Sequence, residues 1–153
     1  MLSRPTTEQI LLDCCRELMT KVLPSVTDAT AQVSVIMVET VLRNTAVRAA
    51  HEVAWMREET ADIEDYAHAV AQQAPAAGSV RAALTALAGA PRDSLHLDDV
   101  VETYCLAGNA LSAALETAVA GGLAALVRRG EEILDVRSAR ETEVMAGWSP
   151  TGR

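Results

Sequence analysis

The chain has 153 residues and half of them are hydrophobic, which suits one domain with a sizeable core. Its net charge of −8 argues against nucleic-acid binding and against docking on an anionic membrane surface, because both need clustered basic side chains. Phe is absent and aromatic residues make up only 3%, so Ala, Val and Leu must fill the core. This composition favours close helix packing and predicts an all-α protein.

The first predicted helix covers residues 7–23. Thr6 and Gln9 have the spacing of a capping box, with Thr7 as the alternative cap, and apolar residues follow at three- and four-residue steps. Pro24 is expected to end this helix at the preceding residue, because a residue before proline is disfavoured in the α region.

The longest predicted helix covers residues 28–59, a stretch without Pro or Gly, and either Thr27 or Asp28 is its expected cap. At 100° per residue, one apolar stripe falls on a single face of this helix. The stripe predicts the seam of a bundle and consists of Val35, Val38, Leu42, Ala46, Ala49, Val53 and Met56.

The opposite side of this long helix is apolar as well in its first half. Val33, Met37 and Val41 lie there, so the helix either occupies a central place in the fold or packs one side on a second copy of the chain. Glu39 lies about 55° from the centre of the apolar stripe. It is therefore expected to be partly buried and paired with Arg43, one turn later.

The second half of the long helix turns polar and acidic around one Trp. His51, Glu52 and Trp55 lie here, and Glu52 and Trp55 follow one side of the helix together with Arg48 and Glu59. Two interpretations stay open. Trp55 is either the anchor of an interface or an ordinary side chain folded over its own bundle at a solvated helix end.

Beyond residue 59 a helix over 61–73 is expected, after a break or a kink at Thr60. Its inward residues are predicted to be Ile63, Tyr66, Ala67 and Val70. A short helix over 80–88 is expected to begin at a Ser79 cap and to end at a left-handed Gly89.

The stretch 97–129 predicts a buried central helix, in which Gly121-Gly122 can produce a bend or a break. A membrane span is not expected there, because Glu116 lies near its middle and small, weakly apolar residues dominate. An exposed helix over 131–145 follows.

These segments together predict a four-helix up-down bundle with one or two extra short helices. The two long helices, 28–59 and 97–129, are its main members. Residues 1–146 are expected to form this single domain, and residues 147–153 a mobile tail.

No metal or catalytic motif is evident. A carboxylate-bridged di-metal bundle needs two Glu-x-x-His pairs, and the only similar sequence runs from Asp65 to His68. His68 is expected instead to pair with Glu64 on a solvated face. The three cysteines lack a CxxC pair for zinc and are odd in number, which predicts a reduced, cytoplasmic protein; they are Cys14, Cys15 and Cys105.

Three stretches near the N-terminus carry a family resemblance: Arg4-Pro5-Thr6, the apolar run to Val22-Leu23-Pro24, and the helix ending in His51-Glu52…Trp55-Met56-Arg57-Glu58-Glu59. They resemble a family of small, uncharacterised bacterial helical proteins over about the first 60 residues. Members tend to be encoded beside acyl-CoA dehydrogenases and aminoglycoside-phosphotransferase-like kinases. The resemblance implies an accessory role to such enzymes and transfers no catalytic residue.

The leading hypothesis is a non-catalytic helical bundle that self-associates as a dimer and partners an enzyme. No cofactor and no metal are expected. The alternative is a small-molecule-binding or catalytic bundle with an apolar pocket between helices, in which Glu39, His51 or His68 supplies the polar group.

Overall fold

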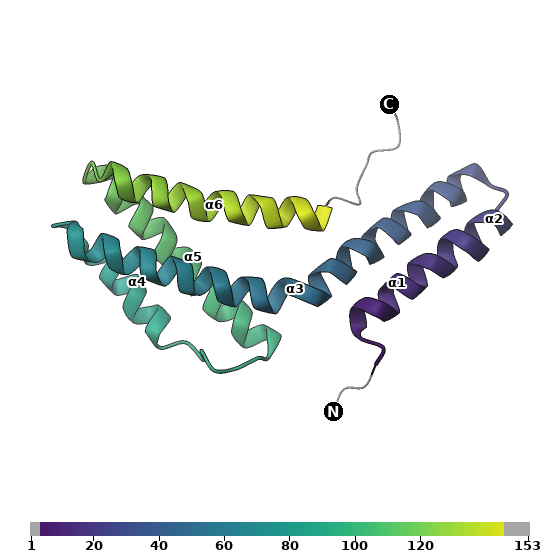
Figure 1. Ribbon diagram of the computed structural model, residues 1–153, viewed down its shortest axis with the longest axis horizontal. Helices are drawn as coiled ribbons and strands as arrows, with labels where there is room; N and C mark the ends of the chain where they lie inside the picture. The colour runs from purple at the N-terminus through teal and green to yellow at the C-terminus, as the bar shows by residue number, and fades with distance from the viewer. Residues whose placement is uncertain (1–3, 146–153) are drawn as a thin grey trace. The chain divides into compact units, whose positions relative to one another are not determined.

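The computed structural model describes residues 4–145, and every regular element among them is helical (Figure 1). The all-α class is therefore confirmed. The chain divides into two compact units: unit 1 consists of Met1–Glu52 and Arg140–Arg153, and unit 2 consists of Val53–Ala139. The predicted tail, residues 147–153, lies outside the described residues.

Unit 1 begins with α1 (Thr7–Glu17), which continues as the π-helical η1 (Leu18–Val22) and the short α2 (Leu23–Ser25). The predicted capping box is confirmed. Gln9 N–H donates to Thr6 Oγ1 at 3.2 Å, and Thr6 N–H donates to Gln9 Oε1 at 2.9 Å. The helical stretch does not end before Pro24, because the wider π turn accommodates a residue that has no N–H to donate.

Unit 1 also contains the first part of α3 (Ala29–Gln73), as far as Glu52. Asp28 is its cap, since Ala31 N–H donates to Asp28 Oδ2 at 2.7 Å. The break expected at Thr60 is wrong, because α3 is one helix over 45 residues. The stretch contains no Pro or Gly, and one Thr costs only about 0.5 kcal/mol of helix propensity.

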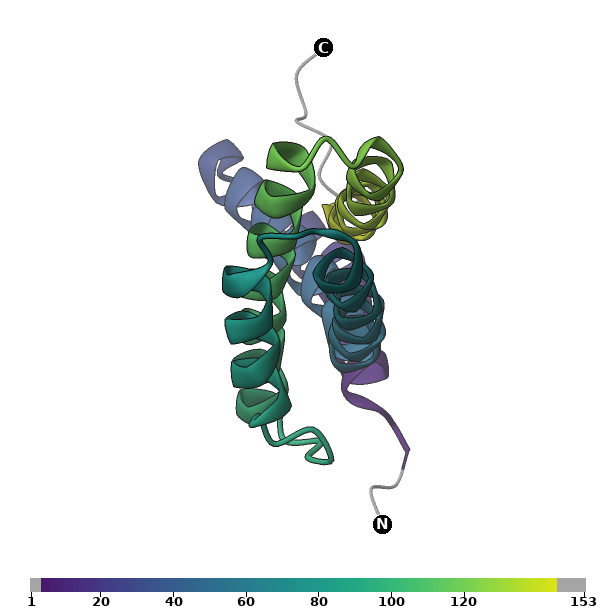
Figure 2. The same ribbon diagram turned by 90° about the vertical axis from the view of Figure 1, so that its left-hand side faces the viewer.

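Unit 2 consists of the second part of α3, α4 (Gly78–Ala88), α5 (Leu97–Ala120) and most of α6 (Ala124–Met145). Consecutive segments alternate in direction (Figure 1). In unit 2, α4 and α5 lie side by side, and α3 and α6 form a second pair (Figure 2). This roughly fits the predicted up-down bundle, although its members are not the four segments expected.

Two of the predicted boundaries in unit 2 are wrong, and the break considered at Gly121-Gly122 is present. The helix expected over 97–129 ends at Ala120, because Gly121-Gly122 breaks it, with Gly122 at φ 65°. Its last residues instead join the segment 131–145 in α6. The helix α4 ends at Ala88 before Gly89, as expected, although Gly89 has φ −82°, which is not left-handed. Its predicted start is wrong, because Ser79 lies inside the helix and does not cap it.

The hydrophobic core lies in unit 2. The four predicted inward residues of 61–73 are all fully buried, which confirms that face of α3. Against them pack small residues of α5, which allow the helix axes to approach closely; they are Ala107, Ala110, Ala114 and Ala118. Within residues 4–145, no helix combines the length and apolar character that crossing a membrane requires.

Candidate functional site

One row of apolar side chains in unit 1 is left uncovered on α3. Val33, Met37 and Val41 are 55%, 60% and 63% exposed. Their spacing of four residues keeps them within about 80° of one another around the helix. We call these three residues the apolar row.

Val38 lies beside the apolar row and is 51% exposed, although the predicted seam placed it inward. The reason is local. The described hydrogen bond between α1 and α3 joins Cys15 to Glu39, about 100° further around α3 than Val38. Of the predicted seam, only Ala46 is fully buried.

Exposed large hydrophobic residues are concentrated in unit 1. Among the described residues it holds nine of them, whereas the larger unit 2 holds six. Those of unit 1 are Ile10, Leu12, Met19, Val22, Val33, Met37, Val38, Val41 and Met145. A surface of this kind marks an interaction site more often than an ordinary solvated face.

The helix that carries the apolar row also carries a small polar cluster around Glu39. Glu39 is buried and paired with Arg43, as the sequence predicted. Cys15 is also buried, and its Sγ donates to the carbonyl oxygen of Glu39 at 3.5 Å. Burial raises the pKa of Cys15, and the negative charge of Glu39 raises it further. The Cys15 thiol is thus kept protonated and serves as a packing group.

The other predicted site residues differ in how far they are exposed. His51 and His68 are exposed, while Glu52 and Trp55 are half-buried. His68 Nε2 lies 3.9 Å from Glu64 Oε1, so the predicted pair on a solvated face is present. Among the described residues, no group of three or more His, Cys, Asp or Glu could hold a metal ion.

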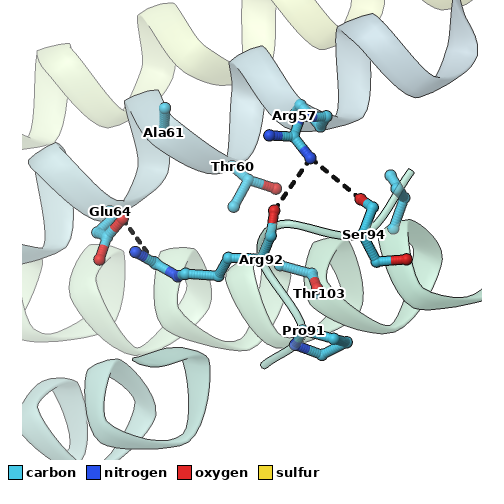
Figure 3. Close-up of a pocket in the computed structure, with 9 residues that line it drawn as sticks. Arg57, Thr60, Ala61, Glu64, Pro91, Arg92, Ser94 and Thr103 are labelled. Carbon is cyan, nitrogen blue, oxygen red and sulfur yellow. Dashed lines mark hydrogen bonds and ion pairs between the residues drawn. The ribbon is translucent and has the colours of Figure 1, made fainter. Parts of the chain in front are cut away.

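Sequence reasoning missed a pocket in unit 2 between α3, α5 and the loop that joins α4 to α5 (Figure 3). Its volume is about 160 Å³. The α3 residues recur at steps of three, one and three, so they share one helix face. The lining is Arg57, Thr60, Ala61, Glu64, Pro91, Arg92, Ser94, Val100 and Thr103. We call it the α3–α5 pocket; Glu39, His51 and His68 do not line it.

Two arginines fasten the loop over this pocket. Arg57 Nη1 donates to the carbonyl oxygens of Arg92 at 3.0 Å and of Ser94 at 3.1 Å. Arg92 Nη2 in turn lies 2.6 Å from Glu64 Oε2. The loop is also tied to α5, because Ser94 Oγ donates to Asp99 Oδ2 at 2.5 Å. Arg57 carried no helical pattern that indicated this role, since its partners are backbone carbonyls of a loop.

Unit 2 contains a second buried carboxylate, that of Glu59 on α3. Arg137 of α6 donates through Nε to Glu59 Oε1 at 2.6 Å and is stacked 5.5 Å from the ring centre of Tyr104. Burial lowers the pKa of Arg137, but the hydrogen bond to Glu59 and its charge outweigh burial and raise it. Burial raises the pKa of Tyr104, with Glu59 adding to it. Both shifts move the pKa values of Arg137 and Tyr104 further above neutral pH.

Comparison with known proteins provides no relative, because no family model, no curated protein and no solved structure matches this chain. The apolar row and the α3–α5 pocket are the two features of the structure on which a function can be built.

Proposed function

We propose that the protein acts through self-association, with the apolar row of one copy packed on the same row of a second copy. The observation that carries this proposal is the exposure of Val33, Met37 and Val41 on one face of a helix. A two-fold dimer uses the same patch on both subunits, so a self-complementary apolar row is sufficient to start it.

Charge favours this face over the rest of the surface. The chain carries −8, yet Glu39 is the only charged residue between positions 29 and 42, and it is buried and paired. Two copies can therefore bring this part of α3 together without opposing charges. Covering a half-exposed Val or Met contributes about 1 kcal/mol. The row thus provides the centre of an interface, which the other exposed apolar residues of unit 1 would extend towards the roughly 800 Å² per partner of a stable dimer.

The test is the molar mass of the whole chain, measured by analytical ultracentrifugation from about 1 to 100 μM, a range chosen from common dimer affinities. We expect a dimer that Met37→Glu converts to monomer, because a charge would be buried at its centre. Val119→Glu is the matched control, since Val119 is 63% exposed but lies on α5 in unit 2. A wild-type monomer throughout, or equal effects of both variants, contradicts the proposal.

The proposal extends to an accessory role in the cytoplasm. The resemblance over about the first 60 residues supports a partner that is an acyl-CoA dehydrogenase or an aminoglycoside-phosphotransferase-like kinase. Free thiols at Cys14, Cys15 and Cys105 support a reducing compartment. Affinity purification from native cells with mass spectrometry tests this part. An enzyme of either class should co-purify, and recovery of neither class contradicts the accessory role without bearing on self-association.

A further inference from the structure

We propose that the α3–α5 pocket binds a small oxyanion, a carboxylate or a phosphate, between the guanidinium groups of Arg57 and Arg92. This site is separate from self-association, because it lies in unit 2 and the apolar row lies in unit 1. Failure of either proposal therefore leaves the other standing.

The charge of the pocket lining is the first argument. Two guanidinium groups and one carboxylate, that of Glu64, line the pocket, so the lining carries a net charge of +1. The chain as a whole carries −8. A positive concave site on an acidic protein attracts anions and repels cations.

The free hydrogen-bonding capacity is the second argument. Arg57 has five N–H groups, and the two on Nη1 are sufficient for the loop carbonyls, so Nη2 and Nε remain for a ligand. Figure 3 shows Thr60 beside Arg57 with its hydroxyl toward the loop, so Thr60 adds a donor to the pocket lining. Guanidinium forks match the oxygens of carboxylates and phosphates.

The Arg92–Glu64 pair does not close the site. The two side chains are 40% and 24% exposed, and ion pairs with such access to water are weak. An incoming anion can therefore take over part of Arg92 from Glu64. Glu64 thus acts as a competitor for the anion, and its removal should strengthen binding.

The size and the walls of the pocket restrict the ligand. A volume of about 160 Å³ accommodates a few heavy atoms. The apolar wall consists of Ala61, Pro91 and Val100 and suits a short aliphatic part. A short-chain carboxylate fits both the charge and this wall, and inorganic phosphate fits the charge alone.

The experiment is an NMR titration of the ¹⁵N-labelled whole chain at constant ionic strength. Separate arms use propionate, inorganic phosphate and, as a cation of similar size, ethylammonium. We expect saturable shifts at the amides of Thr60, Arg92 and Thr103 with an anion and none with ethylammonium. Saturation by propionate alone identifies a carboxylate site, and saturation by phosphate alone identifies a phosphate site.

Four variants make the test sharper. Arg92→Gln should weaken binding about tenfold and Thr60→Val about threefold, as expected for a lost charged and a lost neutral hydrogen bond. Glu64→Gln should tighten binding about threefold, since it removes the competitor. Arg81→Gln is the control and should change nothing, because Arg81 donates to the carbonyl oxygen of Ala71 at 3.0 Å and does not line the pocket.

Several outcomes overturn the proposal: no saturable shift with either anion, saturation by ethylammonium, or weaker anion binding in Glu64→Gln. Thr60→Val keeps the test decisive if Arg92→Gln loosens the loop, because Thr60 takes no part in fastening it. An unchanged affinity in Thr60→Val together with an unchanged affinity in Glu64→Gln also rejects the site.

Discussion

The two units each bury one glutamate, and they neutralise it in different ways. In unit 1, Glu39 pairs with Arg43, four residues later on the same helix. In unit 2, Glu59 pairs with Arg137, 78 residues later on another helix. The first pair can form in an isolated helix, whereas the second requires the folded unit. The pairing of Glu59 therefore depends on the folding of unit 2, whereas the pairing of Glu39 depends on its own helix alone.

The distribution of buried apolar residues shows the same contrast. The core cluster, from Ile63 to Ile133, lies entirely within unit 2. Among the described residues of unit 1, the buried apolar ones are Cys15, Ala46 and Val144. A unit with so few buried side chains gains little free energy of folding by itself, which is consistent with a surface that is completed by a second copy.

The largest difference in stability between the units is expected when a large apolar side chain is replaced by Ala. Leu87→Ala should lower the free energy of unfolding by about 3 kcal/mol, because Leu87 is 0% exposed and a cavity would remain. Met37→Ala should change the stability of the monomer by less than about 0.5 kcal/mol. Urea unfolding followed by circular dichroism, at a concentration below dimer formation, measures both. Equal losses would contradict the contrast between the units.

The next largest difference in stability is expected between substitutions of the two buried glutamates. Glu59→Gln should cost about 2 kcal/mol, because it leaves the partly buried Arg137 without its counter-ion. Glu39→Gln should cost about 0.5 kcal/mol, since Arg43 is 48% exposed and stays solvated. The same unfolding experiment applies. A loss from Glu39→Gln as large as that from Glu59→Gln would show that the local pair is as important as the distant one.

Two glycines test how closely the helices of unit 2 are packed. A Cβ on Gly130 would collide with Leu115 Cδ2 and lie 2.8 Å from Tyr66 Oη, so Gly130→Ala should cost about 1–2 kcal/mol. Gly108 has nothing within 4 Å of such a Cβ, and Gly108→Ala should stabilise α5 by about 0.5–1 kcal/mol. Thermal unfolding of both variants reveals the opposite signs, and a stabilising Gly130→Ala would argue against close packing there.

The smallest effect concerns Tyr66, whose buried hydroxyl has no hydrogen-bond partner within residues 4–145. Tyr66→Phe should stabilise unit 2 by about 1 kcal/mol at pH 7, because it removes an unsatisfied polar group. A loss of stability would show that the hydroxyl is bound to a group such as water.

The same tyrosine gives unit 2 a pH dependence. Burial raises the pKa of Tyr66 above its ordinary value, and the charge of Arg129 only partly opposes this. A folded-state pKa above the unfolded value of about 10 means that the contribution to stability is complete below pH 10 and declines as the pH rises further. Tyr66→Phe should therefore show a weaker decline between pH 10 and 11, measured by urea unfolding. Identical declines would assign the pH dependence to other groups.

The features that could be predicted from the sequence are those formed by residues close together in the chain. The capping box of Thr6 and Gln9, the Glu39–Arg43 pair and the inward face of 61–73 depend on residues within two turns of one another, and all three are confirmed. The sequence left open a break or a kink at Thr60, and the structure excludes the full break, because α3 runs on to Gln73.

The rest depends on contacts that no local pattern encodes. The α3–α5 pocket forms because Arg57 reaches carbonyl oxygens 35 and 37 residues later. Glu59 likewise finds Arg137 only after α6 has folded back. The alternative in which Glu39, His51 or His68 supplies the polar group of a pocket was based on residue type alone, and none of the three lines the α3–α5 pocket.

The adjacent thiols Cys14 and Cys15 provide a kinetic reporter within one molecule. Cys14 is exposed, whereas Cys15 is 1% exposed and bonded to the backbone of α3. An alkylating reagent should modify Cys14 at the rate of a free thiol, and Cys15 only during moments when α1 separates from α3. The ratio of the two rates measures how often α1 separates from α3. If packing against a second copy hinders this separation, the ratio should change with protein concentration.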